Sequence, residues 1–171
     1  IYRGHWKKNK QEGKGKTTWK NGDTYTGEFA NGYLNGKGKY TWTNGREYEG
    51  NWRQGKQHGH GIMKYADGTI YSGDWKNNQK EGKGEFTWKN GNVYTGEFTN
   101  DLRNGTGKYT WANGEEYEGS WVDSSRHGYG VMKFSNGTYK GDWKNGNMEG
   151  KGEYIWKNKD VYTGEFANGL Y

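Results

Sequence analysis

The pattern Tyr-x-Gly-x-[Trp/Phe] occurs eight times in this chain at nearly constant spacing. A fixed period in the twenties is typical of a repeat array, in which each unit packs only on its neighbours. The spacing predicts one array over residues 1–171, and both ends are expected to be truncated from a longer chain because each falls inside a repeat. The copies are 23 residues apart, with one interval of 22, and begin at Tyr2, Tyr25, Tyr48, Tyr71, Tyr94, Tyr117, Tyr139 and Tyr162.

The composition favours an extended sheet over a globule with two packed layers. Only 28% of the residues are hydrophobic and 18% are aromatic, while Gly contributes 32 residues and Pro none. A two-layer core needs more aliphatic residues than this, whereas disordered chains are poor in aromatic residues. Cys is also absent, which excludes disulfides, thiolate metal ligands and Cys nucleophiles.

Residues 25–46 show what one unit encodes. Apolar or Gly positions alternate with polar ones over 25–29 and again over 36–42, and this period of two predicts two strands. Gly32 predicts a tight bend between them, because Gly, Asn and Asp tolerate left-handed backbone angles. Asn44-Gly45, a strong hairpin signal, predicts the turn that ends the unit. The bend is expected again at Asn9, Gly55, Asn78, Asp101, Ser124, Gly146 and Gly169.

Each unit is therefore predicted to be a β-hairpin, and successive hairpins to pair into a continuous antiparallel sheet. Two units depart from the pattern. The unit that follows Asn136-Gly137 is one residue shorter, so a tighter loop is expected there. Lys159 stands where other units have the turn Gly, which predicts a local irregularity.

Pleating places the Tyr, Gly and Trp or Phe positions of both strands on one face. There a ring of one strand can lie over a Gly of the next. A single layer is not expected to bury such a face by itself, so it should leave a large apolar surface open. The middle of this face is our predicted partner-binding groove. Its residues are Tyr40, Trp42, Tyr48, Trp52, Met63, Tyr65, Tyr71, Trp75, Phe86, Trp88, Tyr94, Phe98, Tyr109 and Trp111.

The opposite face carries charged residues of both signs. Cross-strand pairs of opposite charge stabilise a sheet by about 0.2–1 kcal/mol each. The expected pairs place Lys16, Lys39, Lys64, Lys108 and Lys133 near the set Glu28, Asp74, Glu97, Asp142 and Glu165.

The repeats resemble the MORN repeat (membrane occupation and recognition nexus) in their Tyr-x-Gly-x-Trp, bend, Gly-x-Gly and turn Gly. The resemblance covers essentially the whole chain. It implies an all-β fold, an elongated, twisted, single-layer antiparallel sheet of tandem hairpins with one aromatic groove, and it implies a scaffold role. MORN arrays occur in ciliary radial spoke heads, apicomplexan cytoskeletal proteins, junctophilins and plant phosphatidylinositol phosphate kinases, so the repeat alone does not fix the biology.

The function predicted from the residues is a protein-protein interaction scaffold. A groove of Tyr, Trp and Met can accept a helix or an extended segment of a partner, or another copy of the chain. We expect a cytoplasmic protein of a cytoskeletal or ciliary (axonemal) assembly. The alternative is a membrane-apposed module that binds anionic phospholipids through Lys, given the net charge of +6.

Other classes have less support in the sequence. Nucleic-acid binding is not expected, because the aromatic residues occupy repeat-defining positions and 20 acidic residues oppose the basic ones. The Trp-Tyr-Tyr runs of choline-binding hairpin arrays are absent. The Gly-x-Gly pairs recur inside strands rather than before a helix, which rules against a dinucleotide site.

No catalytic, cofactor-binding or metal-binding residues are predicted, and the chain is not expected to be an enzyme. The four His residues are His5, His58, His60 and His127. Only His58 and His60 share a face at short range, so a common metal site is not expected.

Overall fold

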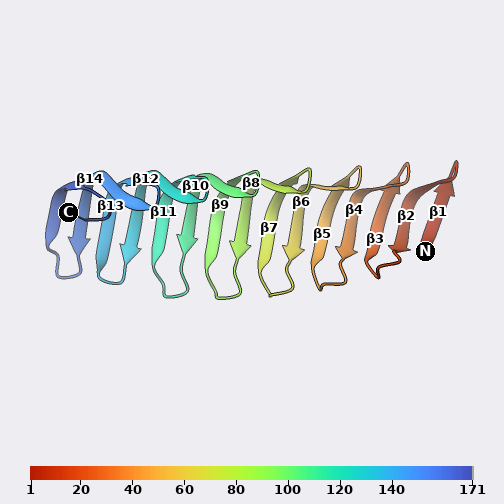
Figure 1. Ribbon diagram of the computed structural model, residues 1–171, viewed down its shortest axis with the longest axis horizontal. Helices are drawn as coiled ribbons and strands as arrows, with labels where there is room; N and C mark the ends of the chain where they lie inside the picture. The colour runs from red at the N-terminus through yellow and green to blue at the C-terminus, as the bar shows by residue number, and fades with distance from the viewer. Residues whose placement is uncertain (171) are drawn as a thin grey trace. The chain divides into compact units, whose positions relative to one another are not determined.

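The computed structural model describes residues 1–170, and Tyr171, the last residue of the predicted array, lies outside the described residues. The described residues form strands and no helix (Figure 1). They group into two compact units, an N-terminal unit over Ile1–Lys89 and a C-terminal unit from Asn90 onward. The expected all-β fold of tandem hairpins is confirmed, whereas the continuity of one array over 1–171 stays a prediction.

Within each unit every strand pairs antiparallel with the strand that follows it in the chain. No second layer of elements covers either sheet among the described residues. The N-terminal unit contains β1 (Tyr2–Lys7), β2 (Lys10–Thr18), β3 (Thr24–Ala30), β4 (Tyr33–Thr41), β5 (Glu47–Arg53), β6 (Lys56–Lys64), β7 (Ile70–Lys76) and β8 (Gln79–Thr87). The C-terminal unit contains β9 (Val93–Thr99), β10 (Leu102–Thr110), β11 (Glu116–Val122), β12 (Ser125–Phe134), β13 (Gly137–Lys144), β14 (Asn147–Trp156) and β15 (Val161–Phe166).

The bend between the two strands of a unit is a two-residue turn. In Asn31-Gly32 both residues have positive φ, 52° and 86°, as in the primed turns whose twist matches that of paired strands. The predicted bends are confirmed, since positive φ recurs at Asn9, Gly55, Asn78, Asp101, Ser124, Gly146 and Gly169.

The turn between units is wider than a two-residue Asn-Gly turn. At Asn44-Gly45 only Gly45 has positive φ, 85°. Its N–H donates to the Trp42 carbonyl at 3.0 Å, and the Trp42 N–H donates to the Arg46 carbonyl at 2.9 Å. This is a type I turn followed by a left-handed Gly. The predicted turn is in place, but its hydrogen bonds extend over five residues.

The two irregular units behave differently. Ser135-Asn136 alone separates β12 from β13, so the tighter loop is confirmed. Lys159 keeps the hydrogen bonds of the regular turn, with its N–H donating to the Trp156 carbonyl at 2.9 Å. The expected irregularity is therefore wrong for the hydrogen-bond pattern, and the departure lies in a φ of 74° at a residue with a side chain.

A β-bulge recurs where the two strands of a repeat pair with each other. Gly27 lies opposite Gly38, but the next residue, Glu28, lies opposite Asn35. The shift leaves the Glu28 carbonyl oxygen available to a side chain, and the Tyr25 hydroxyl donates to it at 3.0 Å. The bulge and the Tyr of the repeat motif are thus parts of one local arrangement.

The core of each unit lies on one face of its sheet, which we call the aromatic face. The Tyr48 ring lies flat over Gly50 and Gly61, where an added Cβ at Gly61 would come within 2.5 Å of the ring carbon Cζ. The glycines therefore form a trough only one ring deep, and the ring in it is 0% exposed. Tyr25 and Tyr71 lie over their own glycine pairs in the same way.

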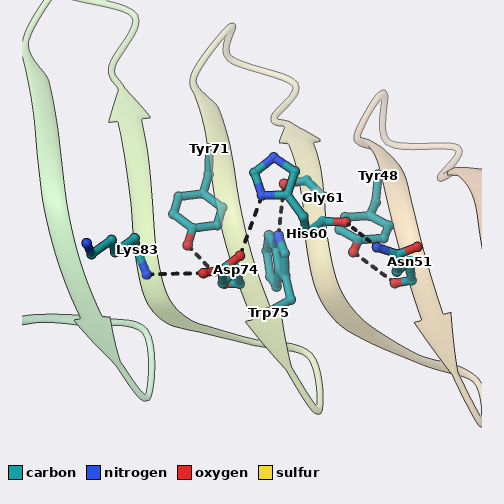
Figure 2. Close-up of polar contacts among 8 residues, drawn as sticks. All are labelled: Tyr48, Asn51, His60, Gly61, Tyr71, Asp74, Trp75 and Lys83. Carbon is teal, nitrogen blue, oxygen red and sulfur yellow. Dashed lines mark hydrogen bonds and ion pairs between the residues drawn. The ribbon is translucent and has the colours of Figure 1, made fainter.

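Except for Trp6, each Trp of the motif lies between two such rings. Figure 2 shows Trp75 between Tyr48 and Tyr71, with edge-to-face centroid distances of 5.3 and 5.1 Å. Its Nε1 donates to the Gly61 carbonyl at 3.2 Å, which holds the indole down on the sheet. Edge-to-face pairs contribute about 0.5–1.5 kcal/mol beyond area burial, so the alternating rings stabilise the unit without a second layer.

Candidate interaction surface

The predicted groove residues fall into two classes by exposure. One class is buried and the other is partly exposed. For the buried class, the expectation that a single layer cannot bury its aromatic face is wrong, because the glycine trough and the flanking indoles enclose these side chains. The buried residues are Tyr48, Trp52, Met63, Tyr71 and Trp75 in the N-terminal unit and Tyr94, Phe98 and Tyr109 in the C-terminal unit. The partly exposed residues are Tyr40, Trp42, Tyr65, Phe86, Trp88 and Trp111.

The partly exposed residues lie on second strands or just beyond them, where they are close to one another. The Tyr40 and Trp42 rings are 4.4 Å apart, and those of Phe86 and Trp88 are 4.6 Å apart. In the C-terminal unit Tyr109 and Trp111 repeat the arrangement at 4.5 Å. Each pair presents ring surface at the end of its strand, next to the turn between units.

A pocket opens on the aromatic face of the N-terminal unit. It measures about 380 Å³. The partly exposed Tyr40 and Trp42 contribute aromatic rings to its lining. The lining residues are Leu34, Tyr40, Trp42, Arg46, Trp52, Gly55, Gln57 and Asn78. Aromatic and aliphatic walls with a few polar groups are typical of a binding pocket.

Arg46 is a pocket residue that the sequence did not indicate. Its guanidinium carbon lies 4.9 Å from the Trp42 ring centroid and 5.7 Å from that of Tyr65. Its Nε is buried and makes no hydrogen bond to any of residues 1–170. Arg46 precedes a strand, at a position that other units fill with Asp23, Thr69 and Asn92, so the repeat pattern gave no sign of it.

Asp23 fixes the position of the Tyr40 ring. Its carboxylate accepts hydrogen bonds from the Tyr40 hydroxyl at 3.0 Å, the Thr43 N–H at 2.9 Å and the Asn21 side-chain amide at 2.9 Å. The Thr43 N–H bond is the main reason that the pKa of Asp23 is lowered from 3.8. Burial, and then the Asp23 hydrogen bond, raises the pKa of Tyr40 to about 12. The wall of the pocket is therefore held in place before any partner arrives.

The C-terminal unit carries arginines on its aromatic face, which sequence reasoning also missed. The Arg103 guanidinium lies 4.4 Å from the Trp121 ring centroid, and that of Arg126 lies 4.2 Å from the Trp143 centroid. Each is the second residue of the second strand of its repeat, β10 for Arg103 and β12 for Arg126. The equivalent residues are Gln11, Leu34, Gln57, Lys80 and Met148, so this is the variable position of the aromatic face.

Lysines on the opposite face pair with carboxylates, but not with those expected. Lys39 Nζ lies 2.8 Å from Glu47, and Lys108 and Lys133 lie 2.7 and 3.1 Å from Glu116. Glu47 and Glu116 are the first residues of strands that pair with the lysine strands, whereas the expected partners Glu28 and Glu97 lie at the bulge. The pairs are partly exposed and stabilise the fold only modestly.

His60 contacts a carboxylate rather than a cluster of ligands. Its Nδ1 lies 3.5 Å from Asp74 Oδ1, and Asp74 Oδ2 accepts the Lys83 N–H at 3.4 Å (Figure 2). Within residues 1–170 no three His, Asp or Glu side chains are grouped as metal ligands would be. The same part of the chain contains no helix long and apolar enough to cross a membrane.

Comparison with protein families finds a match along almost the whole chain. The model described as MORN repeat matches residues 2–24, 25–45, 48–70, 71–93, 94–116, 117–138 and 139–161. The comparison with curated proteins finds no match.

Among solved structures, the chain is similar to the SAS-4 (dCPAP) TCP domain of Drosophila melanogaster in complex with a proline-rich motif of Ana2. Identity is 14%, with 91% of this chain and 85% of that chain covered and a TM-score of 0.55. It is also similar to the G-box domain of the microcephaly protein CPAP, described as suggesting a role in centriole elongation, at 9% identity, coverage of 90% and 87%, and a TM-score of 0.52. At these identities the likeness concerns the fold alone.

Proposed function

The chain belongs to the MORN repeat family, and from this premise we propose that it is a non-catalytic scaffold that binds a segment of another protein on its aromatic face. The observation that carries the proposal is the pocket bounded by Tyr40, Trp42 and Arg46. Aromatic and Arg side chains are the types most often found at the centres of protein interfaces.

The division between buried and exposed rings supports this assignment. Tyr48 and Trp52 already complete the fold, with 0% and 6% exposure. Trp42 and Trp88 add ring surface beyond what covers the glycine trough, and they lie at the ends of strands. Rings that a fold does not need for its own core are available to a partner.

The occupant that fits best is an extended or helical segment of a partner protein. The similar Drosophila domain is described as bound to a proline-rich motif, and proline-rich segments dock on aromatic-lined surfaces in an extended conformation. The similar CPAP domain is described in connection with centriole elongation. These descriptions support our proposal that the chain acts in a cytoskeletal assembly, of which a cilium is one example.

The membrane alternative has less support in the geometry. Lys39, Lys108 and Lys133 already contact carboxylates on the opposite face, which weakens their attraction for anionic headgroups. Binding to lipid is therefore treated as the competing outcome of the test.

A site-specific photo-crosslinker tests the proposal in the full-length protein in its own cells. It is placed at Trp42, in the pocket just beyond the end of β4, and in a second variant at Lys37, an exposed residue of β4 that faces the other side of the sheet. The proposal predicts crosslinks to protein, either a partner or a second copy, from position 42 and not from position 37. Crosslinks to lipid, or equal protein crosslinks from both positions, would contradict it.

A further inference from the structure

A line of side chains crosses the C-terminal unit on its aromatic face, and we call it the outer row. Register places its members on successive strands, with Arg103 opposite Phe98, Arg126 opposite Trp121, and Met148 opposite Trp143. Aromatic rings from first strands thus alternate with a variable residue from second strands. The outer row is Phe98, Arg103, Trp121, Arg126, Trp143 and Met148.

The two arginines are fixed in this row by backbone carbonyls. Arg103 Nη2 donates to the Ser124 carbonyl at 2.8 Å, and Arg126 Nη2 donates to the Gly146 carbonyl at 2.7 Å. Each carbonyl belongs to the two-residue turn of the next repeat, Asp123-Ser124 for Arg103 and Asn145-Gly146 for Arg126. The guanidinium groups are thereby held against the indoles rather than extended into solvent, which lowers the entropy lost when they bind a ligand.

The row places two positive charges over buried aromatic rings. Both arginines are half-buried, and burial lowers the pKa of each guanidinium, with Arg103 adding to the effect at Arg126. Arg stays charged in proteins despite such shifts. Among residues 1–170, Arg126 interacts with a carbonyl, the Met132 sulfur and aromatic rings, and none of these groups is anionic.

We infer that the outer row of the C-terminal unit binds an extended acidic segment of a partner protein, with carboxylates at Arg103 and Arg126. This inference rests on the proposed function and specifies the chemistry of the partner. A guanidinium can form paired hydrogen bonds with a carboxylate, and such charge-assisted bonds are roughly twice as strong as neutral ones. Trp121 is only 4% exposed and lies beneath Arg103, so it supports that guanidinium rather than contacting the segment.

The pitch of the repeat sets the spacing of the carboxylates. One unit contributes two strands, which advance the sheet by about 10 Å. A segment in the polyproline II conformation rises about 3.1 Å per residue, with three residues per turn. Carboxylates three residues apart are therefore about 9 Å apart and face the same side, which matches the separation of equivalent positions in adjacent units.

The same position in the N-terminal unit carries different chemistry. Leu34 and Gln57 occupy it between the aromatic rings and carry no charge. Lys80 also occupies it, but its charge is an ammonium over the Tyr71 and Phe86 rings rather than a planar guanidinium fork. Paired hydrogen bonds to carboxylates are therefore expected to depend on Arg103 and Arg126.

A selection from a random peptide library, with the whole chain as bait, tests the inference. Selected peptides should be enriched in pairs of Asp or Glu three residues apart. Arg126→Gln and Arg103→Gln should each weaken binding of these peptides about tenfold or more, and Arg126→Lys should weaken it less because it keeps the charge. Lys140→Gln, which removes one charge from the opposite face of β13, should leave binding unchanged. Circular dichroism checks that each variant is folded.

The outcomes separate this inference from the function on which it rests. Selected peptides without acidic enrichment, or acidic peptides that bind Arg126→Gln normally, would overturn the inference and leave a peptide-binding scaffold standing. A library that yields no binder at all would overturn both. Salt-sensitive binding of phosphatidylserine vesicles through the two arginines, without acidic peptides, would assign the row to a membrane and contradict the inference.

Discussion

Gly61→Ala tests whether the glycine trough holds the core of the array. The new Cβ would lie 2.5 Å from Tyr48 Cζ and 2.6 Å from Cε2, distances that packed atoms do not tolerate. The ring cannot move sideways, because Trp52 and Trp75 contact it edge-on at 5.0 and 5.3 Å. It must therefore lift away from the sheet.

The expected loss follows from the contacts that the ring gives up. The Tyr48 hydroxyl donates to the Asn51 carbonyl at 3.0 Å, and a lost hydrogen bond of this kind costs about 1 kcal/mol. Two edge-to-face pairs contribute about 0.5–1.5 kcal/mol each, and overpacking adds about 1–3 kcal/mol. Ala also lowers the conformational entropy of the unfolded chain relative to Gly, which stabilises the folded protein by only about 0.4–1 kcal/mol. We expect a net destabilisation of about 4 kcal/mol.

Gly68→Ala is the matched control within the same repeat. Gly68 has a φ of 92° and nothing within 4 Å of an added Cβ, so the substitution strains the backbone without a collision and costs about 1–2 kcal/mol. Denaturant unfolding followed by Trp fluorescence measures both variants, and hydrogen exchange locates the loss in β5–β7. If Gly61→Ala proves no worse than Gly68→Ala, or costs as much in a Tyr48→Ala background, the trough does not hold the ring.

Two further predictions concern the turn at Lys159 and the buried tyrosines. Lys159→Gly should stabilise the protein by about 1 kcal/mol, because Gly adopts the φ of 74° without strain; a lower denaturant midpoint for the variant would show that the Lys side chain contributes more than the strain removes. Burial raises the pKa of Tyr94, Tyr117 and Tyr139 to about 12, whereas an unfolded Tyr ionises near about 10. The unfolded chain then releases protons first, so stability should fall as the pH rises from about 10 towards 12. The tyrosinate absorbance that comes from the buried tyrosines should appear together with loss of the β-sheet dichroism. Ionisation of all tyrosines in a sheet that stays folded would contradict this.

The sequence contained most of the fold because the turns and strands are local. The spacing of Tyr25 and Tyr48 gave the period, and residues such as Gly32 and Asn78 marked the bends, since each requires a left-handed backbone that few residues adopt. The bulge after Gly27 was not predictable, because it depends on how two strands pair rather than on the pattern of either strand. The wider turn at Asn44-Gly45 was not predictable for the same reason.

Less of the interaction surface could be predicted. Tyr48 and Trp52 were correctly predicted to share one face, but their burial depends on the depth of the glycine trough, which a pattern of residue types does not specify. Arg46 and Arg126 were not predicted because they occupy positions that vary between repeats, whereas the motif consists of positions that repeat. In a repeat protein the constant positions build the sheet, and the variable positions on the same face are where specificity can reside.

Detergent extraction of cells that contain the full-length protein tests the central claim most directly. The comparison is between the wild type and a Trp42→Ala, Trp88→Ala variant, in which two partly exposed rings are removed and the buried ones are kept. We predict that the wild type stays with the insoluble cytoskeletal fraction until high salt releases it with partner proteins, and that mild detergent alone frees the variant. If mild detergent frees both proteins together with membrane markers, the aromatic face is not a protein-docking surface and the lipid-binding alternative holds.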